Sequence, residues 1–277
     1  MKSEECSKYI ATLTIAGSDC SGGAGIQADI KTMSALGCYA ASAITAITVQ
    51  NTLGVTAVHA VPPEIVAGQI KAVMDDIEPK AIKIGMVNDA ETIFAIAETL
   101  KAYSLPHLVV DPVMVATSGS RLMQDDALDV FCRELLPLAT LLTPNVPEAE
   151  VLSGIKITDK GNMDKAARRV LQLGCNNLLI KGGHLAGQKV DRLYGDVDCE
   201  YVAENVVTRN THGTGCSLSS AITSFLAQGF STDEAIGKAK EWLTEALKAG
   251  ADVEIGHGHG PVNHFFNPKS LFSLKKQ

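Results

Sequence analysis

The sequence predicts an α/β fold in which helices cover both faces of a mostly parallel central sheet, forming a three-layer α/β/α sandwich. Short apolar runs rich in Val, Ile, Leu and Thr alternate with longer amphipathic stretches along most of the 277 residues. The composition, 46% hydrophobic and 20% charged, is that of a globular protein with a sizeable core. Because no repeat, linker or low-complexity block divides the chain, we expect a single domain over residues 1–277.

The predicted elements follow one another as strand and helix, which implies parallel strands joined by crossover helices. Pro62 and Pro63 ahead of Glu64 suit the start of one such helix. Near the C-terminal third, two strand-like segments suggest an antiparallel hairpin at one edge of the sheet, and two further helices follow it. The strands are expected at 11–16, 41–49, 81–84, 108–111, 141–143, 178–181, 191–196 and 201–208, and the helices at 24–36, 63–77, 90–102, 125–136, 163–173, 215–228 and 232–249.

Charge and cysteine content exclude several classes of protein. The formal charge of −7, with no local basic stripe, argues against a nucleic acid as partner. The 7 cysteines form no CxxC pair and are odd in number, which favours a reducing compartment over a secreted disulfide framework. The N-terminus lacks the apolar core of a signal peptide, and no stretch approaches the roughly 20 apolar residues of a membrane span. We therefore expect a cytoplasmic protein with no membrane partner.

The first strand runs into a glycine-rich turn, Gly17-Ser18-Asp19-Cys20-Ser21-Gly22-Gly23-Ala24-Gly25, at a helix start. The phosphate-binding Lys of a P-loop is missing from it. The G-x-G-x-x-A spacing also fits a dinucleotide fold, but the next strand ends Val49-Gln50-Asn51 without the required carboxylate. Glycines alone still admit a small ligand, and Gln50 can donate and accept, which suits an aminopyrimidine edge. An ordinary tight turn, with an ordinary polar residue at position 50, is the alternative.

A second glycine turn, Asn210-Thr211-His212-Gly213-Thr214-Gly215-Cys216, precedes a helix rich in Ser, Ala and Leu. Unpaired backbone N–H groups at a helix start bind anions, and glycine lets a phosphate approach. Cys216 is expected in the first helical turn, where the helix dipole favours a thiolate that could accept a proton from an attacking hydroxyl. The alternative is a cysteine that serves as a small buried hydrophobe.

Polar residues end three further strands. Asp111 ends one, Asn145 and Glu148 follow the next, and Lys181 ends a third. Carboxylates and an amide are the oxygen ligands that Mg²⁺ takes in proteins, and a Lys can neutralise phosphate charge. Each residue taken alone also suits an ordinary turn or helix start. Together they predict a nucleoside triphosphate site without a P-loop.

The histidines favour no metal site. His257, His259 and His264 lie in a glycine-rich tail without cysteine or carboxylate at ligand spacing, which argues against structural zinc. His212 adjoins the second glycine turn, where it could orient the loop.

With these motifs assembled, the chain resembles the hydroxymethylpyrimidine/phosphomethylpyrimidine kinases of thiamine biosynthesis, which are ribokinase-like enzymes. The resemblance runs from about Ile10 to Phe265. It implies ATP and Mg²⁺ as co-substrates, two successive phosphoryl transfers, to the hydroxymethyl group and then to the monophosphate, and a homodimer. The blocks that carry it are Leu13-Thr14-Ile15-Ala16-Gly17-Ser18-Asp19, Ser21 to Asp29, Lys83-Ile84-Gly85-Met86, Asp111-Pro112-Val113-Met114, Thr143-Pro144-Asn145, Lys181-Gly182-Gly183-His184 and Asn210 to Cys216.

The resemblance also implies a role for each matching residue. The pyrimidine site would comprise Gln50, the backbone near Gly17, Ala24 and Val113, and Met86 against the ring. The site for ATP phosphates would comprise Lys181, Asn145, Thr214 and the amides from Gly213 through Gly215 to Cys216, with Asp111 and Glu148 in the metal shell and Cys216 as general base.

A related pyridoxal kinase is the main alternative. Those kinases tend to lack Gln50 and to carry a Cys where Ala116 follows Val115, so both positions favour the pyrimidine. A nicotinamide dehydrogenase would leave the polar strand ends unexplained, and a non-catalytic pyrimidine-binding protein would not need a second anion turn. Segments 116–121 and 186–190 are small or polar enough to act as lids.

Overall fold

A computed structural model describes residues 7–104, 107–114, 122–124, 126–182 and 190–275 of the chain. Its main sheet has nine strands in the order β10-β9-β8-β7-β6-β5-β2-β3-β4, and β1 pairs with β11 separately. Strands β3, β2, β5, β6, β7 and β8 are parallel, which confirms the predicted mostly parallel sheet. The strands are β1 (Ser7–Tyr9), β2 (Ala11–Asp19), β3 (Tyr39–Asn51), β4 (Gly54–Ala60), β5 (Ala81–Ile84), β6 (His107–Val110), β7 (Leu141–Leu142), β8 (Asn177–Ile180), β9 (Val190–Tyr194), β10 (Cys199–Val202) and β11 (Ser273–Lys275).

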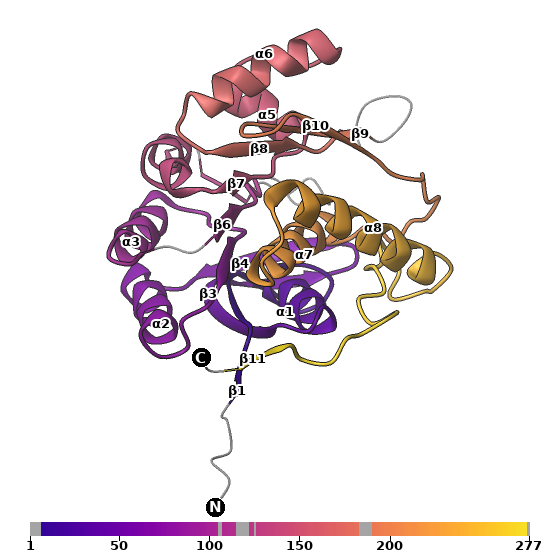
Figure 1. Cartoon of the computed structure of the whole chain (residues 1–277), viewed down its shortest axis with the longest axis horizontal. Helices are drawn as coiled ribbons and strands as arrows, with labels where there is room; N and C mark the ends of the chain where they lie inside the picture. The colour runs from indigo at the N-terminus through magenta and orange to yellow at the C-terminus, as the bar shows by residue number, and fades with distance from the viewer. Residues whose placement is uncertain (1–6, 105–106, 115–121, 125, 183–189, 276–277) are drawn as a thin grey trace, which may run out of the picture.

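Two helical layers enclose the sheet (Figure 1). The side chains of β6 show why: Leu108 and Val110 join one apolar cluster, whereas Val109 between them joins the other. Such two-sided burial is what a parallel sheet covered by crossover helices requires. The first cluster includes residues of α2 (Pro63–Asp76), α3 (Ala90–Lys101), α4 (Ala127–Val130), α5 (Val146–Ser153) and α6 (Lys160–Leu171); α1 (Gly25–Ala35), α7 (Thr214–Ala227) and α8 (Thr232–Gly250) lie on the opposite face.

The sheet places a ligand crevice at β2. Strand β2 has β3 on one side and β5 on the other, so the chain reverses its direction of progress across the sheet here. In open α/β sheets, ligands bind outside the carboxyl ends of the strands at such a point. The first glycine turn follows the end of β2, and the predicted polar strand ends follow β6, β7 and β8 on the same edge.

Several predicted elements need correction. The segment 125–136 is not one regular α-helix: α4 passes into a π-helical turn (Phe131–Leu135) and a 3-10 turn (Leu136–Leu138). The last strand ends at Val202 rather than at residue 208, although its predicted antiparallel hairpin with β9 at the sheet edge is confirmed. Strands β1, β4 and β11 and helix α5 are additions. Among the described helices, none is long and apolar enough to cross a membrane.

Candidate active site

A cavity of about 700 Å³ lies at this edge of the sheet and brings the predicted site residues together. The two glycine turns meet in its wall: a Cβ atom on Gly213 would lie 1.8 Å from the carbonyl oxygen of Gly23. Residues distant in sequence therefore share one site. Its lining includes every residue to which the resemblance assigns a role: Gly17, Ala24, Gln50, Met86, Asp111, Val113, Asn145, Glu148, Lys181, Gly213, Thr214, Gly215 and Cys216.

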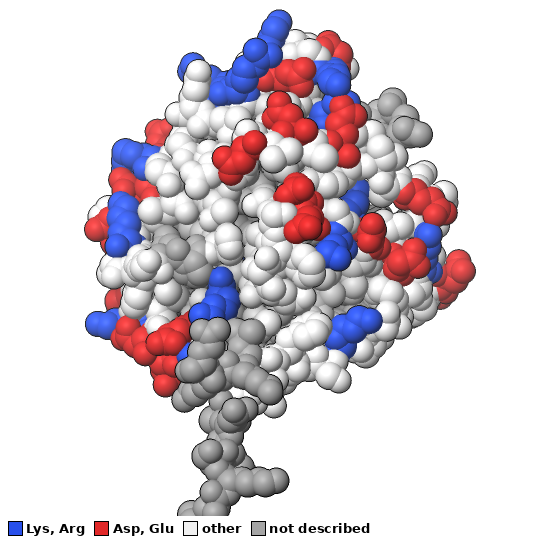
Figure 2. Space-filling model, viewed as in Figure 1, with Lys and Arg blue, Asp and Glu red and all other residues white. Residues whose placement is uncertain are grey.

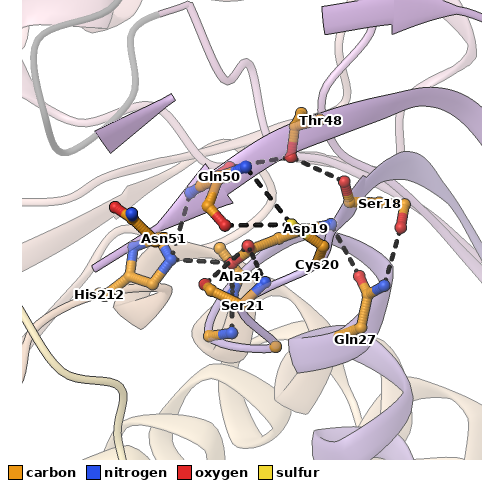
Figure 3. A network of polar contacts seen from close by, with 12 residues as sticks. Ser18, Asp19, Cys20, Ser21, Ala24, Gln27, Thr48, Gln50, Asn51 and His212 are labelled. Atoms are coloured by element: carbon orange, nitrogen blue, oxygen red, sulfur yellow. Dashed lines mark hydrogen bonds and ion pairs between the residues drawn. The ribbon is translucent and has the colours of Figure 1, made fainter. Parts of the chain in front are cut away.

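Asp19, at the end of β2, organises the first turn. Its carboxylate accepts hydrogen bonds from the backbone N–H groups of Ser21 (2.8 Å), Gly23 (3.2 Å) and Ala24 (2.8 Å), and from Nε2 of His212 (2.9 Å) (Figure 3). Burial acts to raise the pKa of Asp19, but the hydrogen bonds from His212, Ser21 and Ala24 outweigh it and hold the pKa well below its ordinary value. The turn is thus built around a buried anion whose hydrogen bonds fix its backbone.

The second turn presents a helix N-terminus to the cavity. Gly213 has a φ of 73° and caps α7, so the N–H groups of the first helical turn lie beside the cavity. The two turns also lie against each other here, because a Cβ atom on Gly213 would come within 3.2 Å of the Cα atom of Ala24. A helix of 14 residues that begins at such a cavity favours an anionic ligand there.

The predicted thiolate of Cys216 is wrong for the ligand-free protein. Burial raises the pKa of the Cys216 thiol to about 11, although the positive charge of Lys83 acts against the rise. The helix dipole and the nearby backbone of Gly25, both of which favour the thiolate, do not compensate for its lost solvation. The resting group at neutral pH is therefore a thiol.

Charged groups cluster where the cavity meets the ends of β6, β7 and β8. Lys181 donates to Asp111 over 2.8 Å, and Asp111 also accepts from Thr143 (3.1 Å). Burial lowers the pKa of Lys181, but the charges of Asp111 and Glu148 raise it more, so Lys181 carries its proton. Lys181 can therefore neutralise phosphate oxygens once a ligand displaces it from Asp111.

Glu148 and Asn145 form a reciprocal cap at the start of α5. The Asn145 side chain accepts from the N–H of Glu148 (2.9 Å), and the Glu148 carboxylate accepts from the N–H of Asn145 (2.9 Å). The side-chain nitrogen of Asn145 has no hydrogen-bond partner within the described part of the chain and can donate to a ligand. Burial, and after it the charge of Asp111, raises the pKa of Glu148 to about 7 despite the opposing charge of Lys181.

A magnesium ion fits this end of the cavity only together with a substrate. No group of three or more His, Cys, Asp or Glu side chains that could hold a metal occurs in the described ranges. However, Asp111 and Glu148 are close enough for one charge to raise the pKa of the other, and a cation between them would relieve that repulsion. Mg²⁺ usually binds through one or two carboxylates, substrate phosphates and retained waters.

The raised pKa of Glu148 gives a testable stability effect. A carboxyl with a pKa near 7 in the folded state and near 4.5 in the unfolded state destabilises the fold progressively as pH rises from about 4.5 to 7. Glu148→Gln keeps a side-chain acceptor for the cap but carries no charge. We therefore expect the melting temperature of the variant, relative to the wild type, to be higher at pH 8 than at pH 5. An equal difference at both pH values, measured by calorimetry, would contradict the assignment.

The sequence analysis missed a buried ion pair beneath the site. Lys83 Nζ lies 2.8 Å from both Asp29 carboxylate oxygens, and both side chains are fully buried. Asp29 also accepts from Thr14 (2.6 Å) and from Ser220 of α7 (2.8 Å), so the pair joins α1 to α7 behind the two turns. A Lys within an otherwise apolar strand was the available signal, since buried Lys is rarely found without a partner.

The apolar end of the cavity was also missed. It is lined by Ala203, Val206, Leu243 and Leu247, and by Lys240 paired with Asp191. These residues come from α8, β9 and the segment after β10, and nothing in their local sequence pattern marks them. The predicted lid segments 116–121 and 186–189, together with Ala116, Gly183 and His184, lie outside the described residues. Val190 begins β9.

Comparison with known proteins identifies the family to which the chain is similar. Residues 19–263 match the family model for phosphomethylpyrimidine kinase. The chain is 52% identical over 256 residues to hydroxymethylpyrimidine/phosphomethylpyrimidine kinase of Rhizobium meliloti, covering 91% of this chain and 96% of that protein. It is 50% identical over 256 residues, 92% of its length, to the thiamine biosynthesis bifunctional protein ThiED of Geobacter sulfurreducens, of which it spans only about half (52%).

A solved structure supports the fold. The chain superposes on an ADP complex of Bacillus subtilis pyridoxal kinase with a TM-score of 0.85 and 36% sequence identity, over 93% of this chain and 98% of that one. The ribokinase-like three-layer fold and the resemblance drawn from the seven sequence blocks are confirmed. With a family match over most of its length and relatives at this identity, the chain belongs to the phosphomethylpyrimidine kinase family, a family of phosphotransferases.

Proposed function

We propose that this protein uses ATP and Mg²⁺ to phosphorylate 4-amino-5-hydroxymethyl-2-methylpyrimidine, and then phosphorylates the monophosphate to the diphosphate, in thiamine biosynthesis. The observation that carries the proposal is the meeting of two glycine turns in one cavity, one beside Gln50 and the other beside Lys181 and Asp111. The first end suits a flat heterocycle with donor and acceptor groups. The second suits the phosphates of a nucleotide.

The pyrimidine end combines polar and apolar contacts. Gln50, at the end of β3, supplies a donor and an acceptor, while Met86 lines the same cavity and is almost fully buried. The sulfur of Met86 lies near Gly17, and a Cβ atom at position 17 would come within 3.1 Å of it. Glycine at this position therefore leaves room for the Met86 side chain in the cavity wall. Backbone groups near Gly17, Ala24 and Val113 complete the binding surface in this proposal.

The nucleotide would extend from the apolar end of the cavity to the second glycine turn. Leu243 and Leu247 offer apolar surface for a base, whereas Lys181, Asn145 and the N-terminus of α7 from Gly213 supply donors for phosphates. Asp111 and Glu148 would hold Mg²⁺ with the phosphates, and that ion would offset the negative charge of the transferring group.

In the proposed reaction, the hydroxymethyl oxygen bonds to the γ-phosphorus as the bond from that phosphorus to the bridging oxygen of ADP breaks. The transition state of such transfers is loose, so positioning and charge stabilisation matter more than proton removal. The amides at the start of α7 and Lys181 would stabilise the equatorial oxygens. The hydroxyl proton would pass to Cys216 in its thiolate form, which is the minor form at neutral pH.

The base role of Cys216 predicts a pH dependence. With a thiol pKa of about 11, the thiolate fraction rises tenfold for each pH unit between 7 and 9. We therefore expect kcat of the wild type to rise with pH over this interval, and kcat of Cys216→Ala to stay low and flat, with a gap of about 100-fold at pH 9. The KM for the pyrimidine should be similar in both proteins. If kcat is independent of pH in both proteins, another group accepts the proton.

A comparison of alcohols tests the function itself. ATP consumption should be measured with hydroxymethylpyrimidine, with its monophosphate and with pyridoxal, each with and without Mg²⁺. The two pyrimidines should be turned over and pyridoxal should be a poor substrate. Preference for pyridoxal would support the second candidate, a pyridoxal kinase, which is the activity named for the B. subtilis structure. Absence of ATP consumption with all three would refute both.

A homodimer, in a cytoplasmic setting, is part of the same proposal. The antiparallel ribbon of β3 and β4 leaves large apolar side chains exposed: Ile47 by 50% and Val49 by 58% on one face of β3, and Leu53 by 66% in the turn that follows. An exposed apolar patch on a sheet edge favours association with another protein surface. Light scattering should give twice the 29.2 kDa chain mass, and Val49→Asp should shift it toward the monomer. A wild-type protein of one chain mass would contradict the dimer.

A further inference from the structure

The side-chain amide of Gln50 lies between two polar groups that constrain its orientation (Figure 3). Its Nε2 is 3.3 Å from Nε2 of His212, and its Oε1 is 3.1 Å from Oγ1 of Thr48. The oxygen and nitrogen of a glutamine amide are nearly the same size, so hydrogen-bond partners decide which is which. The orientation of the Gln50 amide therefore depends on whether His212 and Thr48 each present a hydrogen or a lone pair to it.

On the His212 side, the ring nitrogen carries a hydrogen. Nε2 of His212 lies 2.9 Å from Oδ2 of Asp19, and a carboxylate held far below its ordinary pKa can only accept. The single Nε2 hydrogen of His212 is therefore donated to Asp19, and the Gln50 amide is a second, more distant neighbour of the same nitrogen at 3.3 Å. As placed, the Gln50 Nε2 turns a second N–H group toward it, so neither can accept from the other.

On the Thr48 side, the hydroxyl hydrogen is already engaged. Thr48 Oγ1 lies 2.9 Å from the carbonyl oxygen of Ser18, which can only accept. The single hydroxyl hydrogen of Thr48 goes to Ser18, which leaves an oxygen lone pair facing Oε1 of Gln50. Exchanging the two amide atoms of Gln50 removes both conflicts at once: Oε1 faces the Nε2 hydrogen of His212 as a second acceptor beside Asp19, and Nε2 donates to Thr48.

We propose that His212, itself held by Asp19, is a specificity-determining positioning residue: it fixes the Gln50 amide with its oxygen toward His212 and its nitrogen toward Thr48. This inference rests on the proposed function, because it takes Gln50 as a contact to the substrate. The amide keeps one further hydrogen and one further lone pair for a ligand. The positions of this donor and this acceptor along the cavity wall are then fixed before the substrate binds.

A fixed order matters because it distinguishes related heterocycles. A 4-aminopyrimidine presents an exocyclic donor beside a ring-nitrogen acceptor, and a 4-oxopyrimidine presents an acceptor beside a ring N–H. An amide that can rotate by 180° matches either pattern, whereas a fixed amide matches one and leaves unpaired groups against the other. His212 thus contributes to selecting an aminopyrimidine through the orientation of Gln50.

The surroundings of His212 hold its ring in place. Its backbone N–H donates to the carbonyl oxygen of Gly260 (3.0 Å), and a Cβ atom on Gly23 would lie 2.3 Å from its Cδ2 atom. The side chain is only 10% exposed. The ring belongs to the second glycine turn and packs against the first. Because it is held in place on both sides, it can fix the orientation of the Gln50 amide.

The amide orientation can be read directly in the wild-type protein. In ¹⁵N-labelled protein, the His212 Nε2 signal should be that of a protonated nitrogen, and the Gln50 side-chain hydrogens should show nuclear Overhauser contacts to Thr48 and none to the His212 ring. An unprotonated Nε2, or amide hydrogens next to His212, would overturn the inference. This measurement decides it even if the wild type phosphorylates no pyrimidine, an outcome that would refute the proposed function alone.

Substrate discrimination by a His212 variant tests the functional consequence of this orientation. His212→Phe keeps a planar ring against Gly23 but removes the Nε2 hydrogen. We expect kcat/KM for the 4-amino substrate relative to its 4-oxo analogue to fall at least tenfold in this variant. The KM for ATP should stay within about threefold, because the amides of the second turn are unchanged. Gln50→Ala should lower the same ratio of kcat/KM values, which would identify Gln50 as the residue that distinguishes the two heterocycles. Full discrimination in His212→Phe would overturn the inference.

Discussion

Gly213→Ala is expected to lower kcat/KM at least about 10³-fold while leaving the protein folded. The added Cβ would lie 1.8 Å from the carbonyl oxygen of Gly23 and 3.2 Å from the Cα atom of Ala24, so the two turns must separate. Both close atoms belong to backbone, which cannot rotate away as a long side chain can. Misplacement of reacting groups by about 1 Å costs on the order of 100-fold in rate, and here the phosphate amides move as well.

Gly154→Ala supplies the matched control. Gly154 has a φ of 69°, against 73° for Gly213, so alanine meets similar backbone strain at both positions. Among the described residues, no atom lies within 4 Å of a Cβ atom on Gly154, which follows the end of α5. Both variants should lose about 1 kcal/mol of stability from the left-handed backbone, and only Gly213→Ala should lose turnover. Equal kcat/KM values in the two variants would show that the contact between the turns is not needed for activity.

Lys181→Met is expected to lower kcat/KM by about 10²- to 10³-fold. Lys181 directly follows β8 beside the cavity and pairs with Asp111. Its ammonium can stabilise the negative charge on a transferring phosphate. Met preserves much of the apolar stem and removes only the charge. Steady-state kinetics at saturating pyrimidine, with ATP varied, should show the loss.

Lys240→Met is the control for Lys181→Met, because it removes a different positive charge from the same cavity. Lys240 also lines the cavity, is 13% exposed against 16% for Lys181, and pairs with a buried aspartate, Asp191. Both substitutions remove one partner of a buried ion pair and should lower the melting temperature. Only Lys181→Met should lose most of its turnover. Comparable kinetic losses would mean that ion-pair integrity, rather than the position of Lys181, limits the reaction.

Local pattern predicted most of the fold, because buried parallel strands and amphipathic helices have distinct periodicities. Strand β5 was predicted with its observed bounds, 81–84. The edge strand β4 was not predicted, because its side chains are largely exposed and show no buried face. The helix at 125–136 lost its regularity through Pro137, whose ring prevents a following regular turn, and through packing of Phe131 and Leu135 in the core.

For the site, sequence predicted location better than protonation state. Strand ends and glycine turns place Asp111, Lys181 and Gly213 at one edge because the carboxyl ends of parallel strands meet there. The state of Cys216 depends on burial and on Lys83, a residue 133 positions earlier in the chain, so no local pattern could supply it. The arrangement of Gln50, His212 and Asp19 likewise depends on contacts between three distant segments.

Phosphoryl transfer in this cavity requires the pyrimidine and the terminal phosphate of ATP to occupy the two glycine turns at the same time. Diffraction from crystals grown with hydroxymethylpyrimidine, Mg²⁺ and a non-hydrolysable ATP analogue measures this directly. We expect the hydroxymethyl oxygen to face the γ-phosphorus in line with its bridging bond, with the ring against Gln50 and the phosphate on the amides after Gly213. A γ-phosphate bound away from the Gly213 turn, or a pyrimidine outside the Gly17 turn, would contradict the account.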